Sequence, residues 1–263
     1  MRPPASISTL TRVTPDENAV ESTPELARIL ERAEADDRCL GVILTGSAAR
    51  RMATEHSDLD VYVILTEPIE GVETTRTPEI DTIYLTLAEL SDIPADPGSW
   101  YDRWSFAYAR VLLDKGGVAE AVTAQATLTD IEVAACLDHY LDAYLNFAYR
   151  SLKSDREGRA FERRLDAAES VRCLLWCVFA FNGRVRPYNK YLRWELAHHP
   201  LDDATWSRLP LAELLTAVLD TGDPAAQRRL FAAVEQDARS HGFGDVVDSW
   251  GAELAVLRGA QQD

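Results

Sequence analysis

The sequence predicts an α/β domain followed by an all-α domain, and three observations lead to this prediction. Short apolar runs with strand character follow one another within the first 116 residues. Helical periodicity takes over at about residue 117 and continues towards the C-terminus. Strands that come first and helices that come later are typical of two separate parts. We therefore expect a flexible tail over residues 1–14, an α/β domain over 15–116 and a helical domain over 117–263.

The first domain is expected to begin with a helix over residues 15–37, with Pro15 in its first turn. Its apolar stripe consists of Leu26, Ile29, Leu30 and Ala33. A short helical turn is expected over 47–52. Strands are expected over 41–45, 59–65, 79–87 and 106–113. The segment Asp114-Lys115-Gly116-Gly117 has turn chemistry, so it should end the last of these strands.

The second domain is expected to be a bundle whose helices follow the apolar periodicity. Asp130 is the expected N-cap of the first long helix, and Asn182-Gly183 should end the second. The helices are predicted over 130–153, 158–181, 188–198, 203–220, 224–240 and 244–258.

Charge and composition disfavour several classes of function. The 43 acidic and 27 basic residues give a net charge of −16, which disfavours a nucleic-acid partner and permits a cationic small substrate. We expect no membrane partner, because no uninterrupted apolar stretch reaches about 18 residues. The N-terminus lacks the apolar core of a secretory signal, so we expect a cytoplasmic protein. The four cysteines match no zinc spacing and are expected to be buried, reduced thiols.

Two aspartates stand at the start of the second expected strand, in the stretch Ser57-Asp58-Leu59-Asp60. Alternate residues of a strand point the same way, so Asp58 and Asp60 share one face while Leu59 and Val61 share the other. Two carboxylates that are held close together repel each other, and a divalent cation removes this repulsion. Carboxylate oxygens are hard ligands that suit Mg²⁺, so we expect a magnesium site here.

Gly46 and Ser47 lie between the first expected strand and the short helical turn. A glycine allows the backbone to approach a ligand closely, and the first N–H groups of a helix are unsatisfied. Together these features predict a phosphate cradle. Ser47 and Ser57 would each add a hydroxyl donor to phosphate oxygens. A phosphate site and a magnesium site twelve residues apart suit a magnesium nucleotide.

The pattern Gly46-Ser47 followed by Asp58-x-Asp60 resembles that of the nucleotidyltransferase (DNA polymerase beta-like) superfamily. The stretch GSAARRMATEHSDLD and the helical second half resemble those of bacterial aminoglycoside nucleotidyltransferases of the streptomycin and spectinomycin type. The resemblance implies a nucleotidyltransferase fold with a mixed sheet of about four to five strands, and a helical domain that closes over the nucleotide. It also implies ATP as a substrate and one or two Mg²⁺ ions as cofactors.

The resemblance implies three further site residues. It asks for a third carboxylate on a later strand, where Asp81 is our choice and Glu79 the alternative. The third carboxylate would act partly as a metal ligand and partly to take the proton of the acceptor hydroxyl. Arg172 and Lys190 in the helical half would reach the nucleotide phosphates. For Arg172 the alternative is a surface ion pair with Glu169.

The expected function is therefore magnesium-dependent transfer of a nucleoside monophosphate, with Asp58, Asp60 and Asp81 as metal ligands and catalytic residues. The acceptor would be a hydroxyl group of a small, cationic, aminoglycoside-like molecule, which would make the protein an antibiotic-resistance enzyme. Two alternatives stay open. The chain could be a non-catalytic regulatory or antitoxin-type protein of this fold, or it could adenylylate a protein hydroxyl. The sequence does not indicate the oligomeric state.

Overall fold

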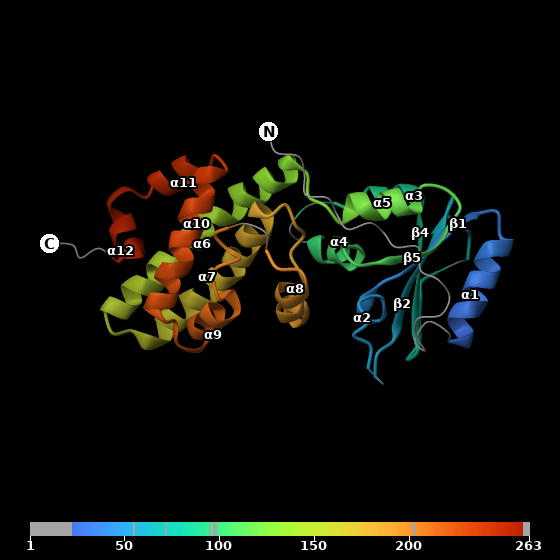
Figure 1. Cartoon of the computed structure of the whole chain (residues 1–263), viewed down its shortest axis with the longest axis horizontal. Coiled ribbons are helices and arrows are strands. Elements are labelled where there is room, and N and C mark those ends of the chain that lie inside the picture. Colours follow the sequence, from blue (N-terminus) through green and yellow to red (C-terminus); the bar gives the residue numbers. More distant parts are fainter. Residues whose placement is uncertain are drawn as a thin grey trace. The chain divides into compact units, whose positions relative to one another are not determined.

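The computed structural model describes residues 23–54, 56–71, 73–94, 96, 99–201 and 204–259. The predicted tail over 1–14 and the expected start of the first helix at Pro15 lie outside these residues. Contacts divide the chain into two compact units (Figure 1). Unit 1 runs to Ile93 and includes Ser105–Ala126, and unit 2 contains Pro94–Trp104 and continues from Thr127. Unit 1 is α/β and unit 2 is helical, which confirms the predicted fold class.

The described part of unit 1 contains one sheet of five strands in the order β3-β4-β2-β1-β5. The central strand β2 runs parallel to its neighbour β4, whereas the other neighbouring pairs run antiparallel. The sheet is therefore mixed, as predicted. The strands are β1 (Cys39–Leu44), β2 (Leu59–Leu65), β3 (Thr75–Arg76), β4 (Ile80–Thr86) and β5 (Arg110–Asp114).

Helices cover both faces of this sheet (Figure 1). On one face, Leu59, Val61 and Val63 of β2 pack with α1 (Pro24–Ala35). On the other face, Tyr62 and Ile64 pack with α3 (Leu87–Ser91) and α5 (Val118–Gln125). The sequence predicts that Leu59 and Val61 share one face of this strand, and their packing in one core confirms this. The aspartates at the start of the strand point to the other face.

Within the described residues, helix α1 begins at Pro24, and Thr23 before it is extended. The Thr23 side chain accepts a hydrogen bond from the N–H of Leu26, and Pro24 occupies the first helical position. The predicted apolar stripe is confirmed, because Leu26 and Ala33 are buried in the core. Ile29 and Leu30 of the same stripe pack against that core.

The predicted strand over 106–113 is wrong in its first half. Phe106 ends helix α4 (Trp100–Phe106), and β5 begins only at Arg110. Short apolar runs fit either a helix end or a strand, and here the aromatic side chain is used in packing. The Phe106 ring lies 5.1 Å from the Tyr62 ring of β2, measured between centroids.

Unit 2 is built around two long helices, α6 (Asp130–Arg156) and α7 (Ala160–Phe181), which pack against each other. The predicted N-cap of α6, Asp130, is wrong. Thr129 caps the helix and forms a capping box with Glu132. In this motif the Thr129 side chain accepts from the N–H of Glu132, and Glu132 in turn accepts from the N–H of Thr129. The predicted end of α7 is confirmed, because Asn182 is its C-cap.

Shorter helices complete unit 2, and three of them differ from the prediction. The expected helix over 188–198 starts as a 3₁₀ turn, and the one over 203–220 is helical only from Leu211. The expected helix over 244–258 is broken near Gly251, whose φ of 50° is unfavourable within a helix. The elements are η1 (Asn189–Tyr191), α8 (Leu192–His198), α9 (Leu211–Thr221), α10 (Pro224–Ser240), α11 (Gly244–Asp248), η2 (Gly251–Glu253) and α12 (Leu254–Arg258).

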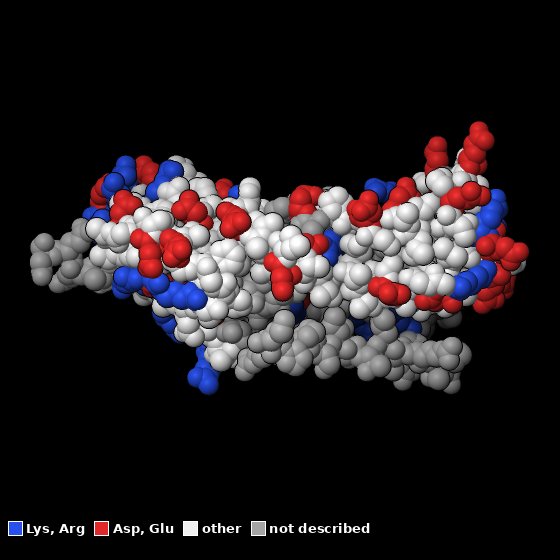
Figure 2. All heavy atoms as spheres, turned by 90° about the horizontal axis from the view of Figure 1, so that it is seen from above, with Lys and Arg blue, Asp and Glu red and all other residues white. Residues whose placement is uncertain are grey.

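The prediction of buried, reduced cysteines is confirmed. All four cysteines are free and buried, and burial raises the pKa of Cys136 to about 12. Among the described residues, none of the helices has the length and apolar character needed to cross a bilayer. On the face in Figure 2, acidic side chains are spread over the surface, and the described basic residues form no continuous patch there.

Thr129→Ala should lower the free energy of unfolding of the helical unit by about 1 kcal/mol, because the N–H of Glu132 loses its acceptor. Thr129→Ser keeps the acceptor and should stay close to wild type. Urea denaturation followed by circular dichroism measures both. A Thr129→Ala variant as stable as wild type would contradict the assignment of the cap.

Candidate functional site

The site is built where the chain crosses from β1 to β2 through the short helix α2 (Gly46–Ala49). The N–H of Thr45 donates to the carbonyl of Asp60 over 2.8 Å, so the end of β1 is fixed to the start of β2. Gly46 follows with a φ of 65°, a left-handed conformation that favours glycine. This bond and this turn bring the Gly46-Ser47 segment next to the start of β2.

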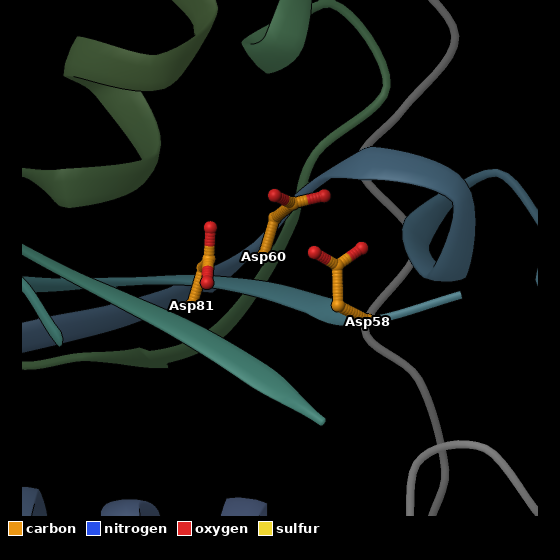
Figure 3. A group of neighbouring side chains, drawn as sticks. All are labelled: Asp58, Asp60 and Asp81. Carbon is orange, nitrogen blue, oxygen red and sulfur yellow. The ribbon is translucent and has the colours of Figure 1, made fainter. Parts of the chain in front are cut away.

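Three carboxylates meet at this end of the sheet (Figure 3). Asp60 and Asp81 are paired residues on the parallel strands β2 and β4, and Asp58 precedes Asp60 by two residues. Their side chains point to the same side of the sheet. One oxygen of each lies within 4.8 Å of one oxygen of each of the others. None of the three is buried, so solvent and ligands can reach them.

The parallel pairing of β2 with β4 distinguishes between the two candidates for the third carboxylate, Asp81 and Glu79. This register sets Asp81 opposite Asp60, whereas Glu79 lies before β4 begins and outside the cluster. The edge strand β3 adds a cation, because Arg76 is the register partner of Asp81. The Arg76 Nε atom lies 3.7 Å from the Asp81 Oδ2 atom, and its side chain is 77% exposed. Sequence reasoning missed Arg76, because only the strand register brings it to this place.

Gly46 and Asp60 are in close contact. A Cβ atom placed on Gly46 would lie 1.8 Å from the Asp60 Oδ2 atom, which is far inside contact distance. Any side chain at residue 46 would therefore displace the carboxylate. The glycine that the sequence assigns to a phosphate cradle thus has a second use, since it leaves room for a carboxylate of the cluster.

The two serines differ in how much of their hydrogen-bonding capacity is used. The Ser57 hydroxyl accepts from the N–H of Thr54 over 2.9 Å and lies 3.3 Å from the Thr54 hydroxyl, within the turn before Asp58. The Ser47 hydroxyl forms no hydrogen bond with any residue that the structure describes. Both serines precede Asp58 in the sequence, and their contact with phosphate stays a prediction.

Arg50 is a residue of the site region that the sequence reasoning missed. It is 6% exposed, and its Nη1 atom donates to the carbonyl of Gly46 over 2.7 Å. A signal was present, because Arg50 follows Gly46 by four residues and a helical turn brings such residues together. The sequence does not reveal that this arginine is buried.

Arg172 and Lys190 belong to unit 2, and their predicted contact with nucleotide phosphates stays a prediction. Arg172 lies on the exposed side of α7, where its Nε atom is 3.3 Å from the Glu169 Oε2 atom. The surface pair considered as an alternative is thus present. Lys190 lies in η1 with its ammonium group 4.7 Å from the centroid of the Tyr191 ring.

The carboxylate cluster fits a divalent metal ion. Three oxygen ligands within 4.8 Å of one another match the hard donors that Mg²⁺ and Mn²⁺ prefer. The cluster is open to solvent, so the remaining ligands can be water or oxygens of a substrate. Mg²⁺ usually binds proteins in this way, through one or two carboxylates together with phosphates and water.

The comparisons with known proteins find similarity among solved structures. No protein-family model matches the chain, and no curated protein matches it either. Among solved structures, the chain is similar to a nucleotidyltransferase-like protein from Exiguobacterium sibiricum 255-15. The match has 16% sequence identity and a TM-score of 0.41, and it covers 90% of this chain and 79% of that chain. At this level it says nothing about the site, whose chemistry follows from its own carboxylates.

Gly46→Ala should weaken divalent-metal binding at least roughly tenfold, because the new methyl group displaces the Asp60 carboxylate. Gly71→Ala is the matched control, since Gly71 also has positive φ but nothing lies within 4 Å of the added atom. Both variants place an alanine at a positive φ, 65° at residue 46 and 76° at residue 71. Free Mn²⁺ measured by electron paramagnetic resonance gives the affinities, and equal affinities for the two variants would contradict the close contact.

Proposed function

We propose that this protein is a magnesium-dependent nucleotidyltransferase that moves a nucleoside monophosphate to a hydroxyl group. The nucleotide that we expect is ATP, so the group transferred would be AMP. The observation that carries the proposal is the cluster of three carboxylates from two adjacent parallel strands. Three carboxylates with oxygens within 4.8 Å of one another repel each other when ionised, and a bound divalent cation would relieve this repulsion. The motif that carries the cluster is the one that resembles the nucleotidyltransferase superfamily.

In the proposed reaction, the acceptor hydroxyl oxygen attacks the α-phosphorus of the nucleotide. The bond from that phosphorus to the β-phosphate oxygen breaks, and pyrophosphate leaves with the electron pair. Asp58, Asp60 and Asp81 would hold Mg²⁺, which supplies the positive charge that stabilises the triphosphate. Asp81 would also receive the proton of the hydroxyl, since it is beside Asp60 and partly exposed, with 20% of its side chain accessible.

Gly46 and Ser47 would contact the β- and γ-phosphates. Two features support this assignment. The Ser47 hydroxyl has no hydrogen-bond partner among the described residues, and Gly46 carries no side chain that would keep a phosphate away. Ser57, the residue before Asp58, would contribute a further hydroxyl donor. Each of these groups would bind the nucleotide without taking part in the proton transfer.

Unit 2 would supply positive charge for the same phosphates, through Arg172 and Lys190. A neighbouring residue supports this role. Arg186 lines a cavity of about 250 Å³ and lies over the ring of Trp176 at 4.9 Å. Its pKa is lowered by burial and also by Arg172. Arg186 forms no ion pair with a carboxylate of the described residues, so its charge is available to an anion.

The acceptor that we propose is a small molecule, with an aminoglycoside as the first class to test. The net charge of −16 favours a cationic acceptor and disfavours nucleic acid. A panel experiment tests this directly. The protein is incubated with Mg²⁺, each nucleoside triphosphate and a set of aminoglycosides, and mass spectrometry looks for an acceptor heavier by one nucleoside monophosphate. Nucleotide binding without pyrophosphate release over a broad panel would instead favour a non-catalytic regulatory protein.

Asp58→Asn should reduce transfer of label from α-³²P-ATP on the order of 10³-fold, because a ligand of the metal is lost. The thermal midpoint should stay equal or rise, since one carboxylate no longer repels the others. Asp37→Asn, which alters an exposed carboxylate in a turn, is the control and should keep wild-type activity. Equal turnover by Asp58→Asn and wild type would contradict the mechanism.

A further inference from the structure

Arg50 is a buried cation at the C-terminal end of α2, the short helix that Gly46 begins. Its Nη1 atom donates to the carbonyl of Gly46 over 2.7 Å, and its Nη2 atom donates to the carbonyl of Ser105 over 3.3 Å. Its guanidinium group also lies 5.7 Å from the centroid of the Tyr108 ring. The guanidinium is therefore fixed between the last turn of α4 and the turn that opens α2.

Burial of a guanidinium group is unfavourable unless its hydrogen bonds are made. Arg50 is 6% exposed, so it has lost most of its water. The carbonyl of Ser105 belongs to the last turn of α4, where carbonyl groups have no partner within the helix and a cation is favoured. The Nη2 atom of Arg50 is thus held by the carbonyl of Ser105, while its Nη1 atom donates to the carbonyl of Gly46.

The Gly46 segment in turn forms the wall against which the Asp60 carboxylate rests. An added Cβ on Gly46 would be 1.8 Å from the Asp60 Oδ2 atom, so the carboxylate and the glycine backbone are already in contact. The backbone of Asp60 is held by the N–H of Thr45, the residue before Gly46. A shift of the Gly46 carbonyl by even a fraction of an ångström would therefore change the space that is left to the carboxylate.

We infer that Arg50 is a positioning residue for Asp60, acting through Gly46, and that it sets the affinity of the carboxylate cluster for a divalent cation. The inference rests on the proposed function, since it takes Asp60 as a metal ligand. Arg50 touches neither substrate nor metal in this account. Supporting groups of this kind change metal affinity by roughly 10- to 100-fold when they are removed.

The test compares Arg50→Met with Lys115→Met. Lys115 is a matched control in the same unit, because it is also a cation that holds backbone carbonyls, those of Ala33, Glu34 and Asp36. Affinity for Mn²⁺ is measured by electron paramagnetic resonance, without nucleotide, and the thermal midpoint of each variant is recorded. We expect Mn²⁺ affinity to fall about tenfold in Arg50→Met and to stay unchanged in Lys115→Met. Arg50→Lys keeps the charge but loses the planar guanidinium whose two Nη atoms reach Gly46 and Ser105, so its affinity should be intermediate.

Two results would overturn the inference, and they can be told apart. If wild type binds Mn²⁺, Asp60→Asn abolishes binding and Arg50→Met leaves the affinity unchanged, the positioning role is wrong while the metal site stands. If wild type binds no Mn²⁺ and Asp60→Asn makes no difference, the metal site and the proposed function both fail. Should Arg50→Met not fold, Arg50→Lys decides, and wild-type affinity in a folded Arg50→Lys variant would count against the inference.

Discussion

The repulsion between three carboxylates is the constraint around which unit 1 is organised. Asp60 and Asp81 are directly paired on parallel strands, so the backbone hydrogen bonds of the sheet fix how close they are. Asp58 points the same way, because it is two residues from Asp60. The strand pairing therefore keeps the backbones of Asp60 and Asp81 side by side, and Asp58 comes directly before β2. In our interpretation the energy to oppose this repulsion comes from the core on both sides of β2 and from a bound cation.

The surroundings of the cluster reflect this constraint. Gly46 leaves the space that the Asp60 carboxylate needs, and Arg50 holds the carbonyl of that glycine from the buried side. On the exposed side, Arg76 of the edge strand lies 3.7 Å from Asp81 and supplies partial compensation of charge. An exposed pair of this kind contributes less than about 1 kcal/mol. A divalent cation at the cluster would compensate much more charge, so Arg76 does not take its place.

Part of this arrangement could be predicted from the sequence, and the missing part has a common physical cause. Alternation along one strand is local, and it placed Asp58 and Asp60 on the face opposite Leu59 and Val61. The choice between Asp81 and Glu79 depends on the register of two strands, which the sequence alone leaves open. The same holds for Arg76. Boundaries failed where short apolar segments fit two structures, as at Phe106, and where two neighbouring polar residues compete for a cap, as at Thr129 and Asp130.

The most direct test of the central claim is a crystal structure with Mn²⁺ and a non-hydrolysable nucleoside triphosphate, recorded at the manganese absorption edge. The account predicts an anomalous peak among the carboxylates of Asp58, Asp60 and Asp81, with their oxygens as direct ligands and phosphate oxygens completing the coordination. An ordered nucleotide with no anomalous peak at these three residues would contradict it. So would a peak held by other side chains while these carboxylates face bulk solvent.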